Sequence, residues 1–266
     1  MVDFKKIQLI FRMARDNPSE FFERTAAAAD RYRDRWRTQR IPPDAINIEQ
    51  ALALMGERLP ASASEMAREP ELVEIERSIF AKAAEVRGRS PFPAYENADA
   101  TLARFCYAVC RALKPLVVLE TGVASGITSA FILHALALNG RGSLWSIDLP
   151  PMAQDAADHV GAVVPQELKS LWHLTIGTSR RILPKLLPEL GEIDIFIHDS
   201  LHTYRNMRAE FEAVWPFLKP GGFLIADDVE MNGAFADFSK ASGCASWYTI
   251  QQDAKKACFG VTIKDS

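Results

Sequence analysis

The chain has 266 residues, of which 48% are hydrophobic and 24% are charged, and its formal net charge is −3. These values are typical of a globular protein with a sizeable core, and the slightly negative charge gives no support to a nucleic-acid partner. No apolar run approaches the roughly 20 residues that cross a bilayer, and the first residues lack the pattern of a secretory signal. We therefore expect a cytoplasmic protein with neither a membrane nor a nucleic-acid partner.

The first third of the chain is predicted to be helical. Apolar residues recur there at helical spacing, and breaks that contain proline separate the runs. Short amphipathic helices need a partner surface, so we predict that residues 1–90 form an extension or lid that docks on a main domain at 91–266. Exposed apolar faces on these helices would also suit a homodimer. The expected helices are Phe4–Ala14, Phe21–Arg37, Ala45–Arg58 and Glu65–Val86.

From residue 97 onwards, helical and strand-like segments alternate. This alternation predicts an α/β fold, a Rossmann-like doubly wound sheet that is mostly parallel, with helices on both faces. The last two strand-like runs are joined by a short polar segment and predict an antiparallel hairpin at the sheet edge. The expected strands are Leu116–Thr121, Ser143–Leu149, His173–Ile176, Ile193–His198, Gly222–Ala226, Ser246–Gln251 and Cys258–Ile263. The expected helices are Asn97–Leu113, Ser129–Asn139, part of Ala153–Ser170, Ser179–Leu190 and Thr203–Leu218.

The segment Leu116–Gly126, with the sequence LVVLETGVASG, resembles the start of a nucleotide-type binding site. An apolar run typical of a buried strand ends in Glu120 and two spaced glycines, and a helix follows. Gly122 and Gly126 lack Cβ atoms where the strand turns into the helix, so backbone can approach a ligand. An ordinary strand-to-helix turn is the alternative, because short glycine motifs give many false positives.

Asp148 ends the second expected strand, where an acid can accept two hydrogen bonds from a ribose diol. A dinucleotide or a nucleoside such as S-adenosylmethionine would satisfy this position. The first turn lacks the G-x-G-x-x-G pattern that a pyrophosphate over the helix N-terminus requires. The sequence therefore favours the nucleoside over a nicotinamide or flavin cofactor.

Three further acids follow the last two parallel strands. Asp199 ends the fourth strand, and Asp227 and Asp228 end the fifth. Carboxylates that converge from adjacent strands suit a hard divalent cation, so we predict a site for Mg²⁺ or another divalent cation. The alternative for Asp227 and Asp228 is that they cap the helix expected near Gly233–Ser239.

Two histidines lie beside Asp199. His202 is three residues beyond it in the same loop and is our candidate general base. His198 occupies the last strand position, where a core histidine or a partner of a neighbouring functional group is favoured over a weak metal ligand.

Four motifs together resemble the class I S-adenosylmethionine-dependent methyltransferases. The closest likeness is to small-molecule O-methyltransferases related to catechol O-methyltransferase and to bacterial natural-product and sugar O-methyltransferases, over about residues 97–264. The motifs are E-x-G-x-x-x-G-x-[ST] (Glu120, Gly122, Gly126, Thr128), S-I-D-L-P around Asp148, F-I-H-D-S-L-H-T-Y from Phe196 to Tyr204, and L-K-P-G-G-F-L-I-A-D-D-V from Leu218 to Val229.

The resemblance implies roles for individual residues. It implies that Glu120, Gly122 and Gly126 line the methionine part of the donor, with Thr128 of the same motif in the donor site, and that Asp148 holds the ribose. Residues Gly177, Thr178 and Ser179 would border the adenine. In the catechol-type members, acids at the positions of Asp199, Asp227 and Asp228 bind Mg²⁺, and His202 stands where those members place a catalytic lysine.

We therefore expect an enzyme that transfers a methyl group from S-adenosylmethionine to the hydroxyl of a small molecule, with Mg²⁺ assistance and His202 as base. One alternative is an NAD(P)-dependent oxidoreductase on a similar sheet, and another is a non-catalytic protein that binds an S-adenosyl ligand. Both alternatives are compatible with the same predicted fold as the methyltransferase hypothesis.

Overall fold

The computed structural model describes residues 4–36, 42, 44–92, 99–153, 155–244, 246–253 and 256–265. Its strands within these residues are β1 (Val117–Thr121), β2 (Ser143–Asp148), β3 (Trp172–Ile176), β4 (Ile193–His198), β5 (Leu218–Ala226), β6 (Trp247–Gln251) and β7 (Cys258–Ile263). They form one sheet in the order β3-β2-β1-β4-β5-β7-β6. Strands β1 to β5 are parallel, whereas β7 runs antiparallel to β5 and β6 antiparallel to β7. The predicted fold class is confirmed.

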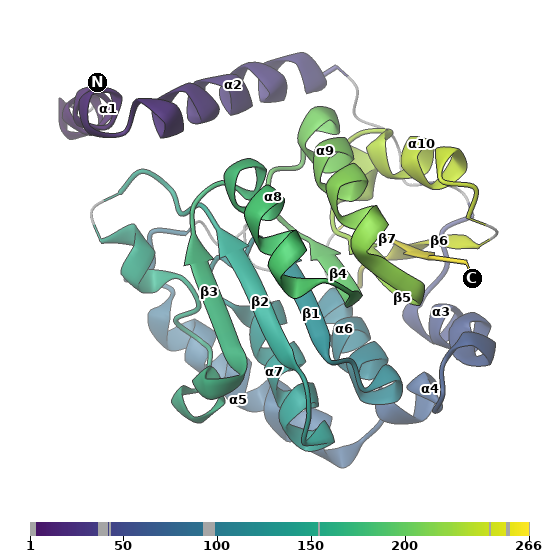
Figure 1. Ribbon diagram of the computed structural model, residues 1–266. Helices are drawn as coiled ribbons and strands as arrows, with labels where there is room; N and C mark the ends of the chain where they lie inside the picture. The colour runs from purple at the N-terminus through teal and green to yellow at the C-terminus, as the bar shows by residue number, and fades with distance from the viewer. Residues whose placement is uncertain are drawn as a thin grey trace.

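Helices cover both faces of this sheet (Figure 1). They are α1 (Phe4–Asp16), α2 (Pro18–Asp34), α3 (Ile48–Met55), α4 (Ala63–Met66), α5 (Pro70–Val86), α6 (Ala100–Leu113), α7 (Ile127–Asn139), α8 (Ser179–Leu190), α9 (Tyr204–Val214) and α10 (Ala234–Ala241). Helices α5, α6 and α7 share one buried core with the sheet, and α8, α9 and α10 share the other. Successive residues of a strand point to opposite faces, so Val118 of β1 joins the first core and Leu119 the second. None of the helices just named is both long enough and apolar enough to span a bilayer.

The N-terminal helices fall into two groups by their packing. Helices α3 to α5 bury Met55, Ile75 and Ile79 in the same core that holds α6 and α7. Helix α2, by contrast, buries none of its residues. It lies across the end of the molecule to which the parallel strands point (Figure 1). Helix α2, which faces the end of the sheet where the parallel strands finish, is therefore held by surface contacts, whereas helices α3 to α5 complete the core.

The connection between β2 and β3 differs from the prediction. We expected part of Ala153–Ser170 to be helical, and the structure has two short 3₁₀ turns there, Ala156–His159 and Gln166–Leu171, in place of an α-helix. Gly161 has a left-handed φ of +69°, and Pro165 restricts the residue before it, so a continuous α-helix cannot form across this stretch.

Three helix boundaries also differ. The run expected over Glu65–Val86 divides into α4 and α5, because a new helix starts at Pro70, where the missing N–H costs nothing. The run expected over Ala45–Arg58 starts as an α-helix only at Ile48, after Ile46 has made a bridge to Ile250 of β6. The helix expected over Thr203–Leu218 ends as an α-helix at Val214, because a 3₁₀ turn over Trp215–Phe217 follows it before β5 begins at Leu218.

Several predicted features lie wholly or partly outside the described residues. These are the proline-containing break at Ile41-Pro42-Pro43, the ends of the expected helices at Arg37 and Asn97, a linker that the Gly and Pro content of Arg87–Pro93 predicts, and the polar turn of the C-terminal hairpin.

The glycine turn after β1 is shaped by the chain's own backbone. Gly122 has a φ of +86°, and its N–H donates to the carbonyl of Ile147 at 2.8 Å. A Cβ atom at Gly122 would lie 1.8 Å from the carbonyl oxygen of Asp199. A Cβ at Gly126 would likewise lie 2.8 Å from the Cα of Gly161. The turn therefore packs directly against the loop that follows β4, through Gly122, and against the connection between β2 and β3, through Gly126.

Replacing Gly122 with alanine tests this close contact. Gly140 also has a left-handed φ, +64°, but its Cβ position is open, so Gly140→Ala is a matched control. Both changes should lower the free energy of unfolding by about 1–2 kcal/mol through backbone strain. Gly122→Ala should lower it clearly further, because the Asp199 carbonyl must move. Equal losses in urea denaturation would contradict the contact.

Candidate active site

The predicted ribose acid, Asp148, is bonded to the glycine turn. Its Oδ2 accepts hydrogen bonds from the backbone N–H groups of Val123 and Ala124, at 2.7 and 3.0 Å. Burial raises the pKa of Asp148, while these two bonds oppose the rise. Arg24 of α2 lies nearby and donates to the carbonyl oxygen of Pro150 at 2.9 Å. The acid thus fixes the turn in place, and its contact with a ribose stays a prediction.

Glu120, the acid of the same motif, is buried inside the domain. Its Oε2 accepts hydrogen bonds from the hydroxyl of Ser129 on α7 at 2.7 Å and from that of Ser146 on β2 at 2.8 Å. Its Oε1 has no hydrogen-bond partner in the described part of the chain. Burial raises the pKa of Glu120 to about 7, although the two hydroxyl bonds lower it. Glu120 therefore links β1 to α7 and β2 through hydrogen bonds beside the glycine turn.

The other predicted donor residues lie around the same edge of the sheet. Thr128 is buried at the start of α7, and no described residue hydrogen-bonds to its Oγ1. After β3, the N–H of Gly177 donates to the carbonyl of Asp148 at 2.8 Å. Thr178 donates to Glu23 of α2 at 2.7 Å, and the hydroxyl of Ser179 donates to Glu210. The structure thus brings this segment close to Asp148 and under α2.

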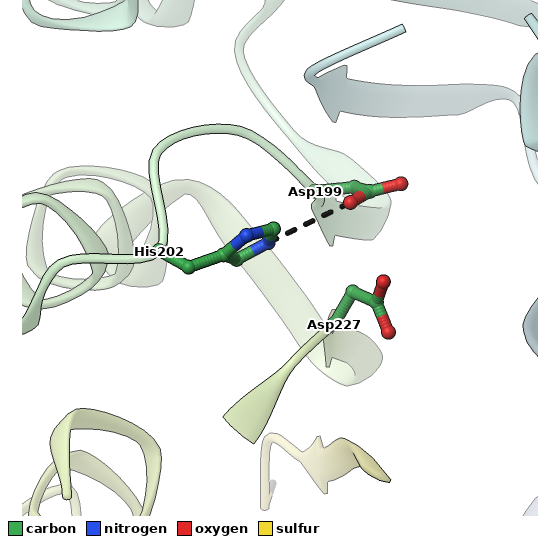
Figure 2. A group of neighbouring side chains, drawn as sticks. All are labelled: Asp199, His202 and Asp227. Atoms are coloured by element: carbon green, nitrogen blue, oxygen red, sulfur yellow. Dashed lines mark ion pairs between the residues drawn. The ribbon is translucent and has the colours of Figure 1, made fainter. Parts of the chain in front are cut away.

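Asp199, His202 and Asp227 form a cluster at the ends of β4 and β5 (Figure 2). Each side chain offers one potential ligand atom, and these atoms all lie within 4.8 Å of one another. The imidazole Nε2 of His202 is 3.6 Å from Oδ1 of Asp199. Asp227 is 2% exposed, and its Oδ1 accepts a hydrogen bond from the side-chain amide of Gln252. The donor atoms, two carboxylate oxygens and an imidazole nitrogen, suit a divalent metal ion.

Asp228 lies on the other side of the same imidazole. Its Oδ2 is 3.5 Å from Nδ1 of His202, the ring nitrogen that faces away from Asp199. Its backbone has a left-handed φ of +50°, which is uncommon for a residue other than glycine. The structure therefore gathers His202 with Asp199 and Asp227, and Asp228 contacts the ring of that histidine. The sequence had grouped the three acids together.

The capping role weighed for Asp227 and Asp228 is wrong. Helix α10 has Gly233 as its N-cap, and Asn232 accepts a hydrogen bond from the N–H of Ala234 at 3.0 Å. Both aspartates are too early in the chain to serve this helix, which leaves their carboxylates to the site.

Glu210 on α9 is a residue that sequence reasoning missed. This buried carboxylate accepts hydrogen bonds from Thr121 at 2.5 Å, from Ser200 at 2.8 Å, from Asn206 at 3.0 Å and from Ser179. Nδ1 of His198 lies 2.6 Å from it.

Although burial would raise its pKa, the charge and hydrogen bond of His198 and the hydroxyls of Ser179 and Thr121 lower the pKa of Glu210 to about 2. A sequence signal existed. Glu210 shares the apolar face of its helix with Met207, Phe211 and Val214, where a charge requires a buried partner. His198 is that partner, in keeping with the roles favoured for it.

Comparison with known proteins gives one family match. Residues 119–229 match the model of a family described as a methyltransferase domain. The chain is therefore similar to this family over that segment. The match begins in β1 and ends just after Asp228, so the glycine turn, Asp148 and the acidic cluster all fall within it. A search among curated proteins found no match.

Solved structures of similar fold include O-methyltransferases. One, from Bacillus cereus in complex with SAH, is 16% identical, with a TM-score of 0.57 over 81% of this chain and 97% of that chain. The O-methyltransferase TomG from Streptomyces achromogenes, involved in tomaymycin synthesis and in complex with SAM, is 16% identical, with a TM-score of 0.54 over 82% and 96%. A methyltransferase from Geobacter sulfurreducens is 18% identical, with a TM-score of 0.52 over 71% and 89%. The resemblance to class I methyltransferases is confirmed, and at this identity the structures establish the fold.

The raised pKa of Glu120 predicts that the stability of the protein depends on pH. Between the ordinary value of 4.5 and the folded value of about 7, the folded protein binds more protons at this group than the unfolded chain does. The free energy of unfolding should therefore fall as pH rises through this window, by about 3 kcal/mol at most. Glu120→Gln should remove that fall, as urea denaturation at a series of pH values would measure.

Glu210→Gln is the matched control. In the unmodified protein, the lowered pKa of Glu210 stabilises the fold above about pH 4.5, and this contribution is lost only as pH falls toward 2. The control should therefore reduce stability without flattening the slope between pH 4.5 and 7. An unchanged slope in Glu120→Gln would contradict the assignment.

Proposed function

We propose that this protein transfers the methyl group of S-adenosylmethionine to a hydroxyl of a small molecule. The observation that carries the proposal is the contact between the glycine turn at Gly122 and the Asp199 backbone. In a methyltransferase domain, this contact would set the donor beside a cluster of carboxylates and an imidazole. The SAH and SAM that accompany the two O-methyltransferase structures of similar fold support the choice of donor.

In this proposal, residues at or after the ends of β1, β2 and β3 bind the donor. Glu120, Gly122, Gly126 and Thr128 line its methionine part, and Asp148 accepts hydrogen bonds from its ribose. The segment Gly177, Thr178 and Ser179 borders the adenine. The backbone bonds that hold Oδ2 of Asp148 support this arrangement, because they fix the carboxylate before a ligand arrives.

Helix α2 would cover the donor edge as a lid. Glu23 accepts a hydrogen bond from Thr178 at 2.7 Å, and Arg24 donates to the carbonyl of Pro150 at 2.9 Å. Asp34, near its end, accepts a hydrogen bond from the N–H of Tyr204 at 2.5 Å. These polar contacts reach the loops after β2, β3 and β4, and no buried apolar residue of α2 reinforces them. Such a cover could open for ligand exchange at low cost.

A divalent cation is part of the proposal, since the donor set of Asp199, Asp227 and His202 fits one. When bound, such a cation supplies Lewis-acid chemistry that lowers the pKa of an acceptor hydroxyl. The protein aligns the acceptor oxygen with the methyl carbon, so that a C–O bond forms as the C–S bond breaks and the hydroxyl loses its proton. His202 takes that proton in the arrangement where its Nε2 faces the acceptor. In the alternative arrangement, the same nitrogen faces the cation.

Donor binding separates the proposal from an oxidoreductase. At 100 times its dissociation constant, S-adenosylmethionine should raise the free energy of unfolding by about 2.7 kcal/mol, because it binds only the folded state. NAD⁺ and NADP⁺ at the same concentration should leave it unchanged. Denaturation with each ligand measures this. Stabilisation by a nicotinamide cofactor alone would favour the oxidoreductase.

Asp199→Asn tests catalysis separately from donor binding. The variant should lose methyl transfer, because it removes one carboxylate charge from the cluster, while calorimetry should still detect donor binding. Release of S-adenosylhomocysteine over a panel of phenols, sugars and polyketides measures turnover. Glu212→Gln, at an exposed position on α9, is the control and should retain activity.

Two outcomes would count against parts of this proposal. Full activity in excess chelator would contradict the metal role. Donor binding by the unmodified protein without turnover on any acceptor would favour a non-catalytic binding protein.

A further inference from the structure

We infer that His202 is itself a metal ligand, through Nε2, in a site completed by Asp199 and Asp227. Asp228 is then the residue that positions its imidazole, and the site prefers Mn²⁺ or a similar first-row ion to Mg²⁺. This inference rests on the proposed function, since it concerns the same cluster. It replaces the set of three aspartates that the sequence predicted.

The separations around His202 support a shared ion. The 3.6 Å between its Nε2 and Oδ1 of Asp199 is too long for a hydrogen bond. Two ligand atoms that each lie about 2.1 Å from one ion are roughly 3–4 Å apart. The distance therefore suits two ligands of one cation. The oxygen of Asp227 completes the set within 4.8 Å (Figure 2).

The second ring nitrogen has the partner that a metal-bound imidazole normally has. Histidine ligands almost always donate the other ring N–H to a carboxylate, a carbonyl or water, which fixes the ring and its tautomer. Nδ1 of His202 lies 3.5 Å from Oδ2 of Asp228, which is longer than a formed hydrogen bond but places this carboxylate to accept the Nδ1 proton after a small movement. With the proton on Nδ1, the lone pair of Nε2 points toward Asp199 and Asp227. An imidazole held in this way is ready to bind a cation.

The backbone separates the roles of Asp227 and Asp228. Asp227 directly follows the last residue of β5 and is fixed by Gln252. Asp228 takes a left-handed φ of +50° and begins a 3₁₀ turn. This sharp change of direction brings the second carboxylate to the far side of the His202 ring. Asp227 is thus placed to bind the ion, whereas Asp228 contacts Nδ1 of His202.

The unequal exposure of the four side chains gives a cation access to the cluster from one side. Asp227 is almost fully buried, whereas the side chains of Asp199, His202 and Asp228 are 17%, 17% and 22% exposed. The cluster therefore has a closed floor at Asp227 and an open side. Three protein ligands leave coordination positions for water or an acceptor oxygen.

The donor atoms determine which ion fits. Mg²⁺ strongly prefers oxygen ligands in a near-ideal octahedron, whereas an imidazole nitrogen suits the later first-row ions. A site with one nitrogen and two carboxylate oxygens should therefore bind Mn²⁺ more tightly than Mg²⁺. Three carboxylates without the imidazole would lack this nitrogen-based preference.

Pulsed electron paramagnetic resonance of the full-length protein with Mn²⁺ tests the ligand directly. The spectrum of the unmodified protein should show ¹⁴N coupling from a bound imidazole. His202→Gln should lose the coupling, and His173→Gln, an exposed histidine on β3, should keep it. Bound Mn²⁺ without ¹⁴N coupling in the unmodified protein would overturn the inference and return His202 to the role of base. This measurement does not depend on the folding of any variant.

Calorimetric titration with Mn²⁺ and Mg²⁺ tests selectivity and the role of Asp228. The unmodified protein should bind Mn²⁺ at least tenfold more tightly, and His202→Gln should bring the two affinities close together. Asp228→Ala should weaken Mn²⁺ binding roughly 10–100-fold with the ¹⁴N coupling retained, and Asp228→Asn should recover part of the loss through its amide oxygen. Equal affinity of the unmodified protein for the two ions would overturn the proposed preference.

These measurements need neither donor nor acceptor. A failure of methyl transfer, seen in the turnover assay, would therefore leave the ligand assignment standing, and the reverse also holds.

Discussion

The carboxylate of Glu210 is the interaction on which the functional edge depends. An unpaired charge in the interior would cost several kcal/mol, so this group is stable because His198, three hydroxyl groups and the side-chain amide of Asn206 converge on it. Its partners come from the ends of β1 and β4, the start of α8, the loop before α9 and α9 itself. A single buried anion thus sets the relative positions of the loops that carry the proposed donor and metal sites.

The acids of this edge are stabilised mainly by the protein itself. Asp148 accepts two backbone N–H groups, Asp227 accepts the amide of Gln252, and Glu210 faces His198. Burial raises the pKa of Glu120 to about 7, and the charge of Asp148 adds to the rise. Among the residues that the structure describes, the cluster of Asp199, His202 and Asp227 is the donor set suited to a metal ion, and Asp228 lies beside its imidazole.

Much of the fold could be predicted from local pattern. Strands buried on both faces read as continuous apolar runs, and all seven expected strands occur near their predicted positions. Errors arose where backbone chemistry overrides periodicity. Gly161 and Pro165 interrupt the apolar pattern between β2 and β3, and Pro70 starts a new helix within one predicted run. The separation of α2 from α3 to α5 also escaped prediction, because an amphipathic pattern does not say which surface a helix will cover.

The sequence by itself determined the order of strands and helices, the polar residues that end the parallel strands, and the resemblance to methyltransferases. These follow from the local chemistry of the chain and from the rule that parallel strands end on one edge. Only the tertiary structure decided which atoms face one another. Glu210 meets Thr121 across 89 residues of chain, and a left-handed backbone at Asp228 sends neighbouring carboxylates to different partners. Such distances and dihedral angles depend on packing between distant segments, which no local pattern encodes.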